Sequence, residues 1–107
     1  MARVLIVEND PALARLLGLQ VAHLGHEPVL RPPTAELPNE FVDAAVIDPA
    51  DAASLAFAWR IRKERPRVRL VLASVLPRSE ATAQLRPDAY LVKPFGLAEL
   101  DRALSAD

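Results

Sequence analysis

The chain has 107 residues, with 13 Lys and Arg against 14 Asp and Glu and no cysteine, which predicts one domain spanning 1–107. The net charge of −1 gives no general attraction to nucleic acid or membranes, and we expect neither as a direct partner. The absence of cysteine excludes disulfides, thiolate metal sites and a cysteine nucleophile. No apolar run is long enough to span a bilayer and the chain begins without a signal-peptide pattern, so we expect a cytoplasmic protein.

The first 25 residues predict a strand, a tight turn and a helix. Arg3–Val7 is apolar almost throughout, as in a strand that is buried on both faces. Asp10 and Pro11 are residue types that favour the N-cap and the first position of a helix. Gly25 follows the helical stripe and is expected to end it.

The rest of the chain repeats this alternation with short elements. Residues 28–30 predict an edge strand, and the three prolines within 31–40 exclude a regular helix of normal length there. The other expected strands are 44–47, 68–73 and 89–92, and the other expected helices are 52–65, 78–85 and 97–104. This alternation predicts an α/β, doubly wound parallel sheet, with the second helix broken or missing and the fourth one short.

Polar residues follow four of the five expected strands. They are Glu8 and Asn9 after the first strand, Asp48 after the third, Ser74 after the fourth and Lys93 after the fifth. In open α/β sheets ligands bind beyond the carboxyl ends of the strands, so these side chains should meet at one edge. Carboxylate and amide oxygens suit Mg²⁺, and an aspartate can attack phosphorus to form an acyl phosphate that a hydroxyl and an ammonium then hold.

Essentially the whole chain resembles the receiver domain of two-component response regulators. The resemblance rests on four segments, 4–11 (VLIVENDP), 43–48 (DAAVID), 72–74 (LAS) and 88–95 (DAYLVKPF), of which the last is the most distinctive. It implies a flavodoxin-like sheet of five parallel strands in the order 2-1-3-4-5. It also implies a signalling protein rather than an enzyme, one that receives a phosphoryl group in a phosphorelay.

The resemblance gives several of these residues an expected role. Asp48 would accept the phosphoryl group from a histidine kinase or a phosphotransfer protein, and Ser74 and Lys93 would engage its oxygens. Tyr90 would be an aromatic switch coupled to Ser74. The bond between Lys93 and Pro94 would be cis, because only an X-Pro bond is readily cis.

The resemblance also implies a Mg²⁺ site formed by Glu8, Asn9, Asp48 and the backbone carbonyl of Ala50. The family has a second acid where this chain has Asn9, so the site loses one negative charge and should bind Mg²⁺ weakly. Asp10 is not expected to replace that acid, because its side chain caps the following helix. The loop after Asp48 is also about two residues shorter than is usual in the family.

Receiver domains signal through one face, which here would consist of 78–85, 89–92 and 97–104 and could also form a homodimer.

An alternative function remains open: a pseudo-receiver that binds partners without being phosphorylated. A phosphatase of the haloacid-dehalogenase type is disfavoured. Those enzymes carry their nucleophile in an Asp-x-Asp motif after the first strand, where this chain has Glu8, Asn9 and Asp10. The sequence does not identify the kinase or the oligomeric state. It also leaves open whether the chain is a whole protein or part of a longer regulator.

Two of the site residues also have a purely structural interpretation. Asp48 precedes Pro49, which is the pattern of a helix N-cap, and Ser74 follows a strand, where serine commonly forms a turn.

The predicted helix at 52–65 carries two further features. Residues 60–69 hold six Lys and Arg against one acid, which we interpret as cations that complement a helix C-terminus rather than as a nucleic-acid patch. Trp59 is predicted to lie in the core and Phe57 to be exposed.

His23 and His26 lie near the end of the first helix without a third ligand type nearby, which favours ordinary histidines over a metal site.

Overall fold

A computed structural model describes residues 2–33 and 36–105, so Thr34 and Ala35 of the proline-rich segment lie outside the described residues. Its strands are β1 (Arg3–Val7), β2 (Glu27–Leu30), β3 (Ala44–Ile47), β4 (Arg69–Ser74) and β5 (Ala89–Val92). Its helices are α1 (Pro11–His23), α2 (Ala52–Glu64), α3 (Glu80–Ala83) and α4 (Leu97–Leu104). In the described part of the chain, no helix combines the length and the apolar character that crossing a membrane requires.

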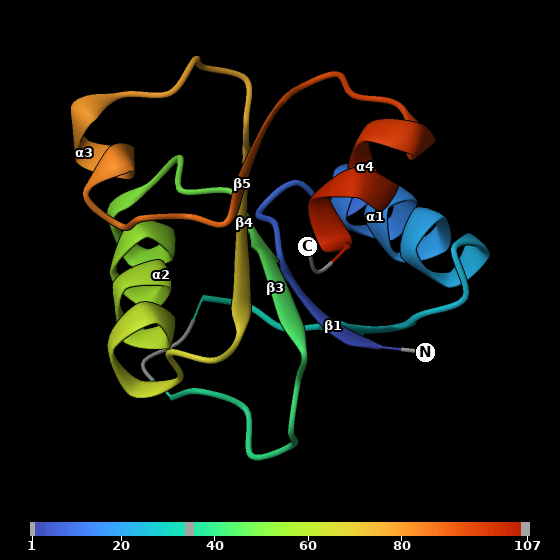
Figure 1. The fold of residues 1–107 in the computed structure, drawn as a ribbon, viewed down its shortest axis with the longest axis horizontal. Coiled ribbons are helices and arrows are strands. Elements are labelled where there is room, and N and C mark those ends of the chain that lie inside the picture. The colour runs from blue at the N-terminus through green and yellow to red at the C-terminus, as the bar shows by residue number, and fades with distance from the viewer. Residues whose placement is uncertain (1, 34–35, 106–107) are drawn as a thin grey trace.

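The five strands form one parallel sheet in the order β2-β1-β3-β4-β5, as predicted. Helices α1 and α4 cover one face and α2 and α3 lie on the other (Figure 1). Alternate residues of β1 face opposite sides: Leu5 and Val7 pack in a cluster with residues of α2, and Val4 and Ile6 pack with residues of α1 and α4. The doubly wound architecture is therefore confirmed, with both faces of β1 buried.

The turn between β1 and α1 is fixed by a cap at the start of the helix. The Asp10 carboxylate accepts two backbone N–H groups of the first turn, at 2.9 and 3.3 Å, and Pro11 occupies the first helical position. Gly25, which follows the C-terminal end of α1, has a φ of +90° that side-chain-bearing residues rarely adopt. Both ends of α1 thus lie where the sequence predicts them, and Glu8 and Asn9 are held in a short loop at the sheet edge.

The segment between β2 and β3 forms no helix in its described residues, 31–33 and 36–43. Instead, side chains attach it to the rest of the molecule. The guanidinium of Arg65 donates to the carbonyl of Pro38 at 2.9 Å, and Val42 is buried in the core beneath α2. The predicted loss of the second helix is therefore confirmed for the described residues, and an arginine from α2's end holds the irregular segment on the sheet.

The helix predicted over 78–85 is shorter than expected, because α3 has only four residues. Ser79 caps it, which starts the helix one residue after the serine, and Arg86 adopts a left-handed φ of 51° just before β5. The Arg62 guanidinium donates to the carbonyls of Leu85 and Arg86, at 2.9 and 2.7 Å. Leu85 is fully buried, so this connection is anchored at its end although α3 itself buries no residue.

The prediction that Trp59 is a core residue and Phe57 an exposed one is wrong. The buried positions of α2 are Ser54, Phe57, Ala58 and Ile61, a stripe with helical spacing. Phe57 is 2% exposed, whereas Trp59 is 42% exposed. Each residue turns a helix by about 100°, so the side chain next to Ala58 points away from the core.

Replacing Phe57 by Ala should therefore lower the free energy of unfolding by about 3–5 kcal/mol, because it leaves a cavity in the core. Replacing Trp59 by Ala should cost less than about 1 kcal/mol, as is usual for exposed positions. Urea unfolding of the two variants measures both values. Equal losses would contradict the buried face assigned to α2.

Candidate functional site

Three charged side chains meet where β1, β3 and β5 end. The ammonium of Lys93 donates to Oδ2 of Asp48 at 2.7 Å and to Oε1 of Glu8. The side chains are 9% exposed for Lys93, 13% for Asp48 and 4% for Glu8. Lys93 lies 85 residues from Glu8 and 45 from Asp48 in the sequence, so the sheet topology brings together the three groups that the sequence placed at one edge.

Backbone hydrogen bonds beyond the last strand residues position these groups. The N–H of Asp48 donates to the carbonyl of Val7 at 3.0 Å, and the N–H of Lys93 donates to that of Ser74 at 2.8 Å. The ladder of the sheet therefore continues by one residue into the site. The Lys93-Pro94 bond is cis, as the sequence resemblance implied.

The charge of Lys93 is set by two opposing effects. Burial of the ammonium lowers the pKa of Lys93, but hydrogen bonds to Asp48 and Glu8 and their negative charges outweigh burial, so that pKa lies above its ordinary value of 10.5. Lys93 is thus a cation at neutral pH. Its stabilising contribution is complete at neutral pH and is lost only as the pH rises through the raised pKa.

One oxygen of Asp48 has no protein partner in the described part of the chain. While Oδ2 is bound by Lys93, Oδ1 is buried without a hydrogen bond. Buried polar atoms almost always have a partner, so Oδ1 is the acceptor that is left for a ligand to satisfy. Mg²⁺ binds through one or two carboxylates and keeps several waters. Asp48 and Glu8 together therefore fit a two-carboxylate Mg²⁺ site.

A third carboxylate lies at the rim of the site but is engaged elsewhere. Asp51 caps α2 by accepting the N–H of Ser54 at 2.7 Å, and its other oxygen accepts the side-chain amide of Asn9. The backbone N–H of Ser54, together with that amide, lowers the pKa of the Asp51 carboxyl. In the part of the chain that the structure describes, no three or more His, Cys, Asp or Glu side chains are grouped to hold a metal.

The role of Asp51 was not identified from the sequence. The signal for it was the spacing of Asp51 and Ser54 before an apolar helix, which is typical of an N-cap. Because Asp51 takes the cap, Asp48 does not, and the interpretation of Asp48 as a mere helix cap is wrong. Ala50 lies exposed between these two acids, and metal ligation by its carbonyl stays a prediction.

The two predicted switch residues both contact Leu76. The Ser74 hydroxyl, which belongs to a 5% exposed residue, accepts the N–H of Leu76 at 3.1 Å. The phenol of Tyr90 donates to the carbonyl of Leu76, 2.9 Å away. Among the described residues no hydrogen bond joins Ser74 to the side chains of Asp48 or Lys93. Ser74 therefore forms a turn here, and its expected role toward a phosphoryl group stays a prediction.

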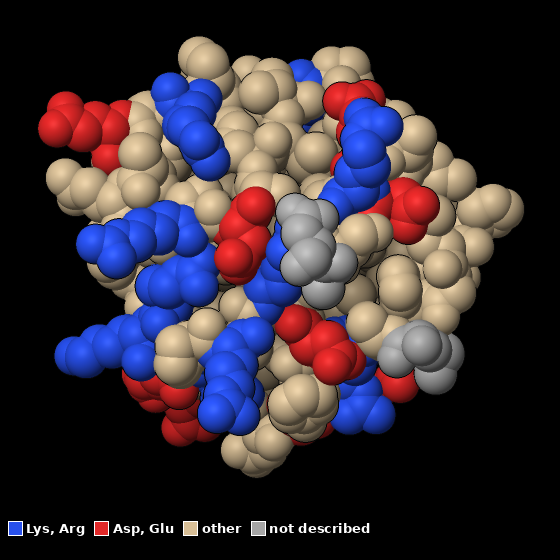
Figure 2. Space-filling model, viewed as in Figure 1, with Lys and Arg blue, Asp and Glu red and all other residues tan. Residues whose placement is uncertain are grey.

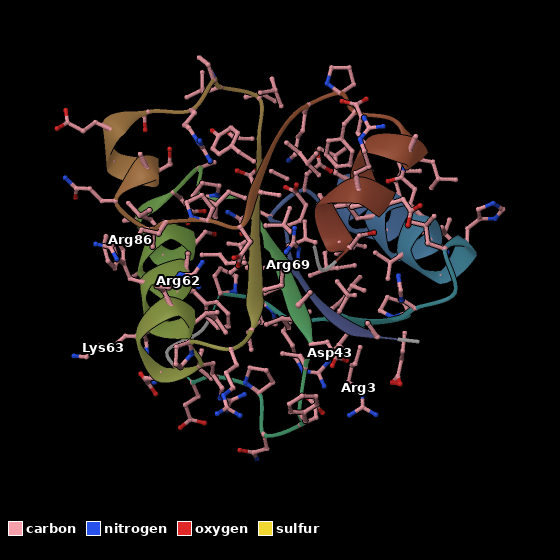
Figure 3. The ribbon with its side chains drawn as sticks, in the orientation of Figure 1. Arg3, Asp43, Arg62, Lys63, Arg69 and Arg86 are labelled. Carbon is pink, nitrogen blue, oxygen red and sulfur yellow. The ribbon has the colours of Figure 1, made fainter. Side chains whose placement is uncertain are left out.

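The basic run at 60–69 holds other segments in place. Lys and Arg side chains gather on the side of the molecule that α2 and α3 cover (Figure 2). Arg65 and Arg69 donate to backbone carbonyls of the proline-rich segment and of α4, at 2.9 and 2.6 Å. Arg62 reaches the residues before β5, where Arg86 lies beside it (Figure 3). Three of the six cations of this run thus bind backbone carbonyls of other segments.

No family model matches the chain, and neither does any protein with a curated description. Several solved structures do match in three dimensions. A response-regulator receiver domain protein from Methanospirillum hungatei superposes with a TM-score of 0.82, 23% identity and coverage of 95% of this chain and 89% of that one. The receiver domain of a modulated diguanylate cyclase from Desulfovibrio desulfuricans superposes with a TM-score of 0.83 and 23% identity, and the match covers 97% of this chain and 90% of that one.

A third match is the response regulator TrrA from Thermotoga maritima, solved in complex with Mg²⁺ and beryllium fluoride. Its TM-score is 0.80 at 24% identity, over 95% of each chain. The chain therefore has the fold of response-regulator receiver domains.

Replacing Lys93 by Met should destabilise the protein by about 3–5 kcal/mol at neutral pH, because Glu8 and Asp48 would remain buried without a cation. Urea unfolding at neutral pH measures the loss. Arg15→Met, which removes an exposed cation from α1, is the control and should cost less than about 1 kcal/mol. Equal losses in the two variants would contradict the assignment.

Proposed function

We propose that this chain is a receiver domain of a phosphorelay, which accepts a phosphoryl group on Asp48 from a histidine kinase or a phosphotransfer protein. The main support for this proposal is the environment of the Asp48 carboxylate. Lys93 binds one of its oxygens, and the other is buried without a partner in the described residues. Lys93 thus orients the carboxylate, and the second oxygen keeps its acceptor capacity unused by the described residues. The likeness of the fold to receiver domains supports the proposal.

In the proposed reaction a carboxylate oxygen of Asp48 attacks the phosphorus of a phosphohistidine. A P–O bond forms and the P–N bond breaks, and the imidazole leaves with the electron pair and takes up a proton. Lys93 remains against the carboxylate and offsets the charge that collects there. Glu8 and Asp48 are the residues that would hold Mg²⁺, whose charge neutralises the phosphoryl oxygens.

The surface beside the pocket suits a protein donor. An apolar hollow of about 300 Å³ shares Lys93 with the pocket and is lined mainly by residues of α1 and of the segments after β4 and β5. Two of its lining residues are large and apolar yet at least half exposed, Leu16 at 50% and Val75 at 67%. Exposed apolar surface of this kind is typical of sites where another protein binds.

A phosphorylation-independent interaction module is the second candidate. It is favoured by the side chain that stands at the second acid position, because the amide of Asn9 is bound to Asp51 instead of adding a carboxylate to the pocket. The two candidates differ in whether the pocket of Asp48 reacts at all.

Labelling with a small phosphodonor such as phosphoramidate separates the two candidates. With millimolar Mg²⁺, intact-mass analysis should find one phosphoryl group on the wild-type protein and none on Asp48→Asn. The control Asp101→Asn, which changes an exposed acid on α4, should be labelled like the wild type. Absence of labelling on a folded wild-type protein would contradict the first proposal, and partner binding unchanged by Asp48→Asn would support the second.

A further inference from the structure

A side-chain hydrogen bond joins two loops at the rim of the pocket. The amide nitrogen of Asn9, in the loop between β1 and α1, donates to Oδ2 of Asp51. Asp51 is itself fixed, because Oδ1 accepts the N–H of Ser54 and caps α2. The loop that carries Glu8 is thereby tied to the N-terminus of the helix that follows Asp48.

The carboxylates at this edge are all engaged by N–H groups of the protein. Lys93 binds Glu8 and Asp48, and the other oxygen of Glu8 accepts the backbone N–H of Asp10 at 3.2 Å. Asp51 receives the amide of Asn9. Protein donors thus engage each of these acids, and of their carboxylate oxygens Oδ1 of Asp48 is the one that is buried without a partner among the described residues.

An acid at position 9 would produce a different pocket. Its carboxylate would face that of Asp51 at the distance where Asn9 now forms a hydrogen bond. Two carboxylates at such a short distance repel each other, and the repulsion is relieved by proton uptake or by a bound cation. Asn9 avoids that repulsion, since its amide provides a donor where an acid could provide only acceptors.

We infer that Asn9 is a positioning residue that makes the structure of this pocket independent of a divalent cation. Its hydrogen bond to Asp51 holds the loop of Glu8 against α2, a task that would fall to the cation if position 9 were acidic. The inference rests on the proposed function only in that Asp48 is the reactive group of the pocket. The pocket is therefore assembled before any Mg²⁺ binds, and Mg²⁺ adds little to the stability of the wild-type protein.

The substitution Asn9→Asp tests this inference. In EDTA its thermal unfolding midpoint should fall below that of the wild type, and millimolar MgCl₂ should restore most of the loss. Titration calorimetry with MgCl₂ should give an affinity at least about tenfold higher than for the wild type, because affinity for such cations rises with the number of charged ligands. An unchanged Mg²⁺ affinity would overturn the inference.

Two further variants separate the hydrogen bond from the charge. Asn9→Ala removes the bond without adding charge, so it should lower the unfolding midpoint equally with and without MgCl₂. If Asn9→Ala is as stable as the wild type, the bond positions nothing. The double variant Asn9→Asp/Asp51→Asn keeps a good helix cap but removes the facing acid, so the gain in Mg²⁺ affinity should disappear. Persistence of the gain would mean that Asp51 is not the facing group.

None of these measurements depends on phosphoryl transfer. Failure to label Asp48 would contradict the proposed function and leave the stability and Mg²⁺ titrations of the Asn9 variants interpretable. Conversely, a wild-type midpoint that rises with MgCl₂ as much as that of Asn9→Asp would contradict the inference even if Asp48 is phosphorylated.

Discussion

One ammonium group between two nearly buried carboxylates determines how the strand-end pocket is built. Lys93 contacts Glu8 and Asp48, so charge joins the ends of β1, β3 and β5. Backbone hydrogen bonds at the same edge join β3 to β1 and β5 to β4. Burying either acid alone would be costly, and a buried cation repays that cost only when its partners are close and well oriented. The parallel strands supply that orientation. The fold therefore determines which oxygen of Asp48 binds Lys93 and which one is left without a partner in the described residues.

The fold and the meeting of the charged groups could be predicted because both follow from rules that act over whole elements. Apolar runs fix the strands, helical stripes fix the crossovers, and parallel strands bring their carboxyl ends to one edge. Glu8 and Lys93 therefore meet although almost the entire chain separates them. That argument needs only the place where each strand ends, and it does not require the direction of any single side chain.

Apart from the length of α3, the errors and omissions concern side-chain direction. The predicted burial of Trp59 and Phe57 was the reverse of what is observed. Successive side chains of a helix differ in direction by about 100°, so a small error in the predicted phase moves a side chain from the core to solvent. The bond between Asn9 and Asp51 depends on two loops that no periodicity describes. Ser74 was correctly placed at the sheet edge, but the partner of its hydroxyl is decided by the local turn.

The exposure of Trp59 has a practical consequence for spectroscopy. It is the only tryptophan of the chain, and it lies 42% exposed on the solvent side of α2. Because the indole is already partly hydrated in the native state, we expect its emission to change less on denaturation than that of a fully buried tryptophan. The same indole becomes a sensitive optical reporter of any molecule that covers this helix.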